Sequence, residues 1–141
     1  MKDEAIQKAA FVANSLSEGA SPERVIEIFE TILKSDHKLR RVVYRAKLSA
    51  ERGIVSLDDL RIRTEHQNKG YGSRVLAMLI DLCDKNGLTI KVVPAPPESD
   101  AHCAVSVTRS DLIRWYEDAC FRRSTRYIWI RKPRTVPTGR P

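Results

Sequence analysis

The sequence predicts an α/β (α+β) fold, because helical and strand patterns follow one another along a chain of one-domain length. Apolar residues recur at helical spacing over residues 22–34 and 74–85. Strand patterns cover residues 41–48 and 54–63, and a short apolar strand follows over residues 88–93. The chain has 141 residues, which is the length of a single domain.

A pair of helices is expected over residues 1–34. The first covers residues 3–16 and ends at a Ser-Glu-Gly segment. Ser21, Pro22 and Glu23 then supply an N-cap hydroxyl, a proline at the first helical position and an acid in the first turn. The second helix therefore begins at Pro22. Its expected apolar stripe consists of Val25, Ile26, Phe29, Ile32 and Leu33.

The second strand changes phase in its middle. Residues 49–53 are expected to form the turn before it. Val55 and Leu57 share one phase of the alternation, whereas Leu60 and Ile62 share the other. An extra residue near Asp58-Asp59 would return all four side chains to one face, as a β-bulge does. The alternative is a strand that breaks at this point.

The remaining elements follow from local signals. Asn86-Gly87 is a stop signal for the helix over residues 74–85. The loop over residues 94–109 is long for a compact domain, which favours a functional role. Ser110-Asp111 opens another helix, and residues 125–131 alternate as a final strand.

Composition excludes several classes of protein. Hydrophobic residues make up 42% of the chain and charged residues 30%, which is typical of a folded soluble domain rather than a disordered one. The longest near-apolar stretch, residues 75–80, falls far short of the roughly 20 residues of a membrane span. No signal peptide is visible, and the three cysteines lack paired spacing. A cytoplasmic protein without a membrane association is therefore expected.

Positive charge is concentrated at the C-terminal end. Residues 122–141 hold seven basic residues and no acidic one, so the first 121 residues hold 18 of each kind. This favours an anionic partner near that end, such as a phosphorylated cofactor or nucleic acid. A solvated tail is the alternative, because residues 133–141 contain three prolines and one glycine and are expected to be flexible.

A polar loop with two glycines precedes the helix over residues 74–85. Glycines at a helix N-terminus let main-chain amides approach a phosphate. The loop lacks the Gly-Lys-Ser/Thr of a P-loop. It also lacks the third small residue of a dinucleotide fingerprint, because Val75 stands three residues after Gly72. Histidines and cysteines lack zinc spacing, so no metal site is expected.

A third sequence motif matches this glycine-containing loop. The segment Gln67-Asn68-Lys69-Gly70-Tyr71-Gly72, after Leu60-Arg61-Ile62, resembles the Gln/Arg-x-x-Gly-x-Gly/Ala signature of the GCN5-related N-acetyltransferases. Residues 111–121 also look like the later helix of that family, which carries a tyrosine. The resemblance covers about residues 41–131. It implies a mixed, mostly antiparallel central sheet flanked by helices, in a single domain over residues 1–132.

The resemblance implies an acetyl-CoA site and transfer of the acetyl group to a primary amine. The amides of residues 69–73 would hold the pyrophosphate, and the end of the strand before them would pair with the pantetheine arm. A bulge in that strand would leave an amide free to polarise the thioester carbonyl. The expected cofactor-binding residues are Leu60, Arg61, Ile62, Gln67, Asn68, Lys69, Gly70, Tyr71, Gly72 and Ser73.

Tyr116 matches the family tyrosine near the sulfur, which makes it the expected general acid. A packing role for its ring is the alternative. The general base is left open. The candidates are Asp58, Asp59, Glu65, His66 and His102, and a water relay is a further option.

Three departures from the family leave the acceptor amine undefined. Cys120 stands where the family often has glycine, the asparagine after the fifth strand is not recognisable, and the N-terminal region is helical. The partner is expected to be a small molecule or a peptide, and the oligomeric state is open, although dimers are frequent in such proteins. A different class stays open: a catalytically silent module of the same fold, whose basic C-terminal end contacts nucleic acid or an acidic protein.

Overall fold

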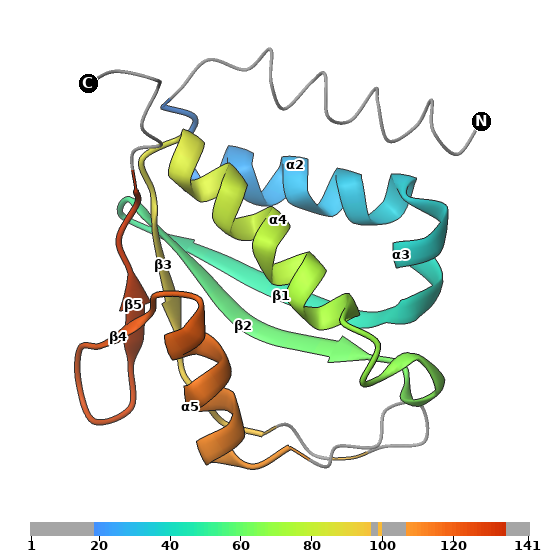
Figure 1. The fold of residues 1–141 in the computed structure, drawn as a ribbon. Coiled ribbons are helices and arrows are strands. Elements are labelled where there is room, and N and C mark those ends of the chain that lie inside the picture. Colours follow the sequence, from blue (N-terminus) through green and yellow to red (C-terminus); the bar gives the residue numbers. More distant parts are fainter. Residues whose placement is uncertain (1–18, 97–98, 100–106, 135–141) are drawn as a thin grey trace, which may run out of the picture.

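The computed structural model describes residues 19–96, 99 and 107–134. These residues form one five-stranded sheet with helices packed on it (Figure 1). The strand order is β1-β2-β3-β5-β4; the β2–β3 pair is parallel and the other three pairs are antiparallel. The prediction of a mixed, mostly antiparallel sheet with flanking helices is therefore confirmed.

The elements have the following bounds. The helices are α2 (Pro22–Ser35), α3 (His37–Val42), the short 3-10 helix η1 (Thr64–His66), α4 (Tyr71–Lys85) and α5 (Arg109–Asp118). The strands are β1 (Val43–Glu51), β2 (Ile54–Ile62), β3 (Thr89–Val92), β4 (Arg122–Arg123) and β5 (Trp129–Arg131).

Helix α2 begins as predicted. The Ser21 hydroxyl accepts a hydrogen bond from the Arg24 amide, and Pro22 occupies the first turn. The predicted helix over residues 3–16 lies outside the described residues. The prediction of a strand beginning at residue 41 was wrong about where the strand starts. Residues 37–42 form α3, and β1 begins at Val43. The cause is Asp36, whose carboxylate caps α3 by accepting from the amides of Lys38 and Leu39.

The β1–β2 hairpin contains the predicted bulge. Its turn is only Arg52-Gly53, because β1 runs on to Glu51, and Gly53 has a φ of 65°. Lys47 pairs with Asp59 and the next residue of β1 pairs with Leu57, so Asp58 is the extra residue of β2. The β-bulge at residues 58–59 is therefore confirmed, and the broken-strand alternative is not.

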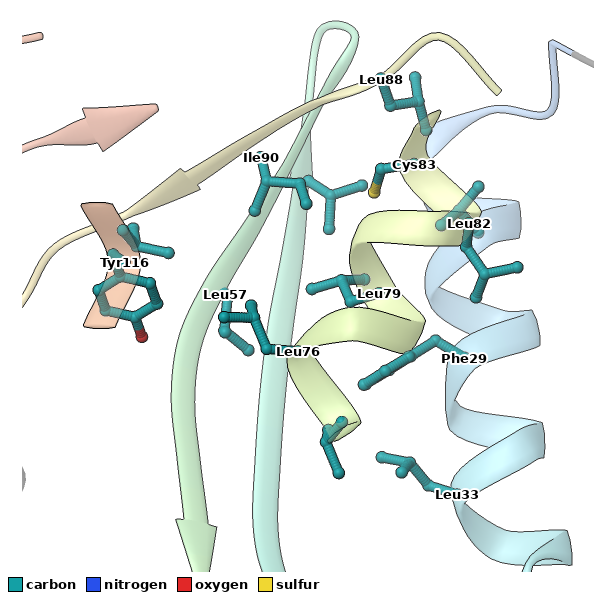
Figure 2. Packing of buried hydrophobic residues seen from close by; sticks show 14 of the residues in the cluster. Phe29, Leu33, Leu57, Leu76, Leu79, Leu82, Cys83, Leu88, Ile90 and Tyr116 are labelled. Atoms are coloured by element: carbon teal, nitrogen blue, oxygen red, sulfur yellow. The ribbon is translucent and has the colours of Figure 1, made fainter. Parts of the chain in front are cut away.

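Helices α2 and α4 pack on one face of the sheet (Figure 1). Helix α4 turns its buried residues Leu76 and Leu79 toward Leu57 of β2 and Phe29 of α2 (Figure 2). Cys83 is fully buried in the same cluster. The helix ends at the expected signal, with Asn86 as C-cap and Gly87 at a φ of 68°.

Two C-terminal elements differ from the prediction. Helix α5 begins at Arg109 rather than at Ser110, because Thr108 and Asp111 form a reciprocal capping box. The strand expected over residues 125–131 is instead a short hairpin of β4 and β5. The Thr125 hydroxyl accepts from the amides of Tyr127 and Ile128 and so holds a turn where the strand was expected.

A buried ion pair joins the end of α4 to the last strand. Arg131 of β5 is 7% exposed, and its guanidinium donates to the Asp84 carboxylate of α4 and to the Ala119 carbonyl after α5. The Arg134 amide also donates to Asp84. No described helix is long and apolar enough to cross a bilayer.

Candidate functional site

Strand β2 continues beyond the last of its residues that pairs with β3. The parallel ladder between them runs from Ile54–Thr89 to Leu57–Val92 and ends there. Over residues 58–62, β2 is paired with β1 only, among the strands of the described chain. Figure 1 shows β2 bending away from β3 toward the N-terminus of α4. The bulge at Asp58 thus marks the point where the two central strands separate.

The loop after β2 has a backbone shape that suits an anion. Asn68 has a φ of 61° and Gly70 a φ of 84°, whereas Lys69 between them is not left-handed. Left-handed residues within a turn are characteristic of the main-chain concavities that bind anions, so the backbone of this loop is compatible with such a site. Gly70 is also the N-cap of α4, and no side chain caps the helix in its place.

The amides of residues 70–73 are not engaged within the described part of the chain. Arg74 is the first residue of the segment whose amide has a helical partner, the Gly70 carbonyl at 3.1 Å. The main-chain nitrogens of residues 70–73 make no hydrogen bond to any described residue, whereas the hydrogen-bonded turn through Gln67 and Asn68 directs the Lys69 amide back toward a carbonyl of residues 64–66. Three of them belong to the first turn of α4, where the helix dipole adds positive potential.

Two cations stand beside the same helix end. The Lys38 ammonium lies 5.7 Å from the centre of the Tyr71 ring, and the Arg74 guanidinium lies 5.9 Å from it. His66 packs edge-on against this ring, with the ring centres 6.1 Å apart. The positive groups come from α3 and α4, which makes the neighbourhood of the loop favourable for a phosphate.

Side chains fix the loop to the elements around it. The Gln67 side-chain amide donates to the Ile62 carbonyl at 2.9 Å and so joins the loop to the end of β2. The indole N–H of Trp115 in α5 donates to the Ser73 hydroxyl at 3.0 Å. A Cβ built on Gly72 would lie 3.8 Å from Trp115 and 3.9 Å from Ile62, so these three residues meet at one place.

Tyr116 lies on the other side of β2 from α4 (Figure 2). It is 8% exposed, and its ring packs against Trp115 and Phe121 at centre distances of 5.0 and 5.2 Å. Burial, and then the Asp59 charge, raise the pKa of Tyr116 to about 12. Its hydroxyl makes no hydrogen bond to a described residue, and it is not a fully enclosed polar atom. The Tyr116 hydroxyl is therefore a protonated donor without a described hydrogen-bond partner, near the point where β2 and β3 separate.

The two acids of the bulge differ in their surroundings. Asp59 is bound by the Arg61 guanidinium at 3.0 Å and lies 3.7 Å from Arg45, so its charge is neutralised. Asp58 is exposed, and its carboxylate accepts from the Ser56 hydroxyl at 2.8 Å. Of these two acids, Asp58 is the one that has no cation bound to it within the described chain.

The structure brings some of the expected residues together and leaves others apart. Residues 60–62 end β2, and residues 67–73 follow after η1; the Gln67–Ile62 hydrogen bond brings the two ranges together. Glu65 and His66 lie in η1, on the loop side and not on the bulge. His102 and most of the loop over residues 94–109 lie outside the described residues.

Sequence reasoning missed three contributors to the site. Arg74 directly follows the glycine loop and could have been found there. Lys38 belongs to α3, a helix that the sequence pattern did not reveal. Trp115 belongs to α5, and its bond to Ser73 joins positions 42 residues apart. No local pattern in the sequence predicts this bond or the position of Lys38 beside Tyr71.

Among described residues, no group of three or more His, Cys, Asp or Glu side chains could hold a metal ion. Comparison of the chain with protein-family models, with curated proteins and with solved structures finds no match.

Proposed function

We propose that this chain is an acetyl-CoA-dependent N-acetyltransferase with a site like that of the GCN5-related family. The observation that carries the proposal is the loop of residues 68–73. Its backbone leaves the amides of residues 70–73 without a described partner, at the N-terminus of α4. Such a loop suits the pyrophosphate of coenzyme A, with Lys38 and Arg74 adding positive charge.

The end of β2 supports a place for the pantetheine arm. The ladder between β2 and β3 ends at Leu57 and Val92, and the arm would lie beside Leu60, Arg61 and Ile62 as an additional strand. Gln67 would keep the strand and the phosphate loop in register by its bond to the Ile62 carbonyl. The bulge at Asp58 would direct a main-chain group toward the thioester carbonyl.

The reaction would proceed by direct attack. The lone pair of a neutral amine forms the new C–N bond at the thioester carbonyl carbon, and the C–S bond then breaks. The departing thiolate takes a proton from the Tyr116 hydroxyl, and the amine nitrogen loses a proton to a base. A pKa near 12 keeps Tyr116 protonated at neutral pH, as a general acid requires.

Asp58 is the better base candidate on the bulge. Asp59 is neutralised by Arg61 and Arg45, whereas Asp58 has only the Ser56 hydroxyl as its described partner. A carboxylate at this position would also attract a cationic amine before it loses its proton. Asp58 would take that proton through a water molecule.

Calorimetry with acetyl-CoA tests the proposal. Binding at tens of micromolar or tighter is expected, followed by release of free thiol when a suitable amine is added. The informative set of acceptors contains simple amines, polyamines, peptides and aminoglycosides. No heat of binding with folded protein would contradict the proposed cofactor site, whatever the acceptor.

A further inference from the structure

The β4–β5 hairpin carries an arginine-rich surface that the acetyl-transfer proposal does not use. We define the hairpin surface as Arg109 of α5 together with Arg122, Arg123, Arg126 and Tyr127 of the hairpin. All five residues are exposed, and Tyr127 is 60% exposed. Figure 1 shows the hairpin at the edge of the sheet, at the opposite side from the loop before α4.

The guanidinium groups are held close together by aromatic rings. Arg109 and Arg123 lie 5.5 and 5.8 Å from the centre of the same Trp129 ring. Arg126 lies 5.6 Å from the centre of the Tyr127 ring. Arg109 also donates to the Arg126 carbonyl at 3.1 Å, which joins α5 to the hairpin tip. Like charges are therefore gathered by stacking on aromatic faces.

No carboxylate neutralises this surface within the described residues. None of its four arginines forms an ion pair there, whereas Arg24, Arg45, Arg61 and Arg131 each do. The Glu117 carboxylate accepts from the Trp129 indole N–H at 3.3 Å and forms no described ion pair with these arginines. Repulsion among the unpaired guanidinium groups would be relieved by a bound polyanion.

We propose that the hairpin surface binds single-stranded nucleic acid. Arginine guanidinium groups match phosphate oxygens in a bidentate way, and all four cations of the surface are arginines. The exposed Tyr127 ring offers a face on which an unpaired base can stack. Arginines spaced around an exposed ring match the alternation of phosphates and unpaired bases along a single strand, so nucleic acid is favoured over an acidic protein. This inference does not rest on the acetyl-transfer proposal.

The charge test uses the full chain and a labelled single-stranded RNA of about 12 nucleotides, a length within the usual site sizes of such proteins. The double variant Arg122→Gln/Arg126→Gln is compared with Lys47→Gln/Arg52→Gln, which removes the same charge from exposed positions of the β1–β2 hairpin. Anisotropy at low salt should show about a tenfold or greater rise of Kd for the first and less than about a twofold change for the second. Equal effects of the two double variants, or no binding by the unmodified chain, overturn the proposal.

The stacking test leaves the charge unchanged. Tyr127→Ala should raise Kd at least about fivefold, because stacking of one base contributes about 1–3 kcal/mol, whereas Tyr127→Phe should retain affinity. Inorganic polyphosphate of similar length is the second probe and should bind more weakly than the RNA. Unchanged RNA affinity in Tyr127→Ala, or equal affinity for polyphosphate, would assign the surface to polyanions in general and overturn the proposal.

Discussion

A cysteine occupies a left-handed backbone position after α5. Cys120 has a φ of 71°, and its amide donates to the Glu117 carbonyl at 3.0 Å as the helix ends. A side chain in this conformation costs about 1–2 kcal/mol, because Cβ approaches the following carbonyl oxygen. Glycine is common at such a position because it lacks Cβ and avoids this strain. Cys120 therefore lowers the stability of the folded chain relative to glycine.

Cys120→Gly is therefore expected to stabilise the protein. Relief of the left-handed strain exceeds the extra chain entropy of glycine, which leaves a gain of about 0.5–1 kcal/mol in the free energy of unfolding. Urea unfolding followed by circular dichroism measures it, with Cys120→Ala as the matched control. A glycine variant no more stable than the alanine variant would contradict this reading of the strain.

Tyr116 is the residue whose hydroxyl and ring can be separated by mutation. Tyr116→Phe keeps the contacts with Trp115 and Phe121 and removes a hydroxyl that has no described hydrogen-bond partner. Stability should thus change by less than about 0.5 kcal/mol. If the hydroxyl is the general acid, kcat should fall about 100-fold with little change in the KM for acetyl-CoA. Equal losses of affinity and turnover would indicate a packing role instead.

At the scale of elements, β2 and the loop after it were largely predictable. The phase change between Leu57 and Leu60 located the bulge, because an inserted residue must shift every later side chain to the other face. The glycine loop also followed from local chemistry, whereas α4 begins at Tyr71, three residues before the predicted start. Helix α3 was missed, because its six residues are too few for a helical period to appear in the sequence.

The loop before α4 can be tested by placing a charge in it. Gly72 does not have a left-handed φ, and a Cβ there would make only ordinary contacts. Gly72→Asp and Gly72→Asn have nearly the same shape and differ in charge. We expect the aspartate to weaken acetyl-CoA binding at least about tenfold more than the asparagine does, since a like charge beside phosphate costs more than about 1.4 kcal/mol. Calorimetry measures both; equal affinities would exclude a phosphate at this loop.

At the scale of the whole molecule, the Asp84–Arg131 pair connects α4, β5 and the end of α5. Both side chains are largely buried, with 11% and 8% of their surfaces exposed. The C-terminal basic residues are thereby divided into two groups. Arg131 is a structural residue, whereas the arginines of the hairpin surface remain exposed. The charge of the sequence alone could not make this distinction.

Asp84→Asn should destabilise the protein by about 3 kcal/mol, because it leaves the buried Arg131 guanidinium without a countercharge. Asp81→Asn is the matched control on the same helix: its pair with Lys85 is 3.1 Å long but has 60% and 48% of the side chains exposed. The control should cost less than about 1 kcal/mol. Urea unfolding of both variants gives the comparison, and similar losses would mean that burial does not set the strength of the pair.

Local spacing was sufficient for the N-cap of α2, the apolar face of α4, the bulge and the glycine loop, because each of these depends on residues a few positions apart. Long-range contacts determined the rest: Lys38 beside Tyr71, Trp115 on Ser73, the burial of Tyr116 and the pairing of Arg131 with Asp84. Their energies arise only when the folded chain excludes water between distant segments, so no pattern along the sequence records them.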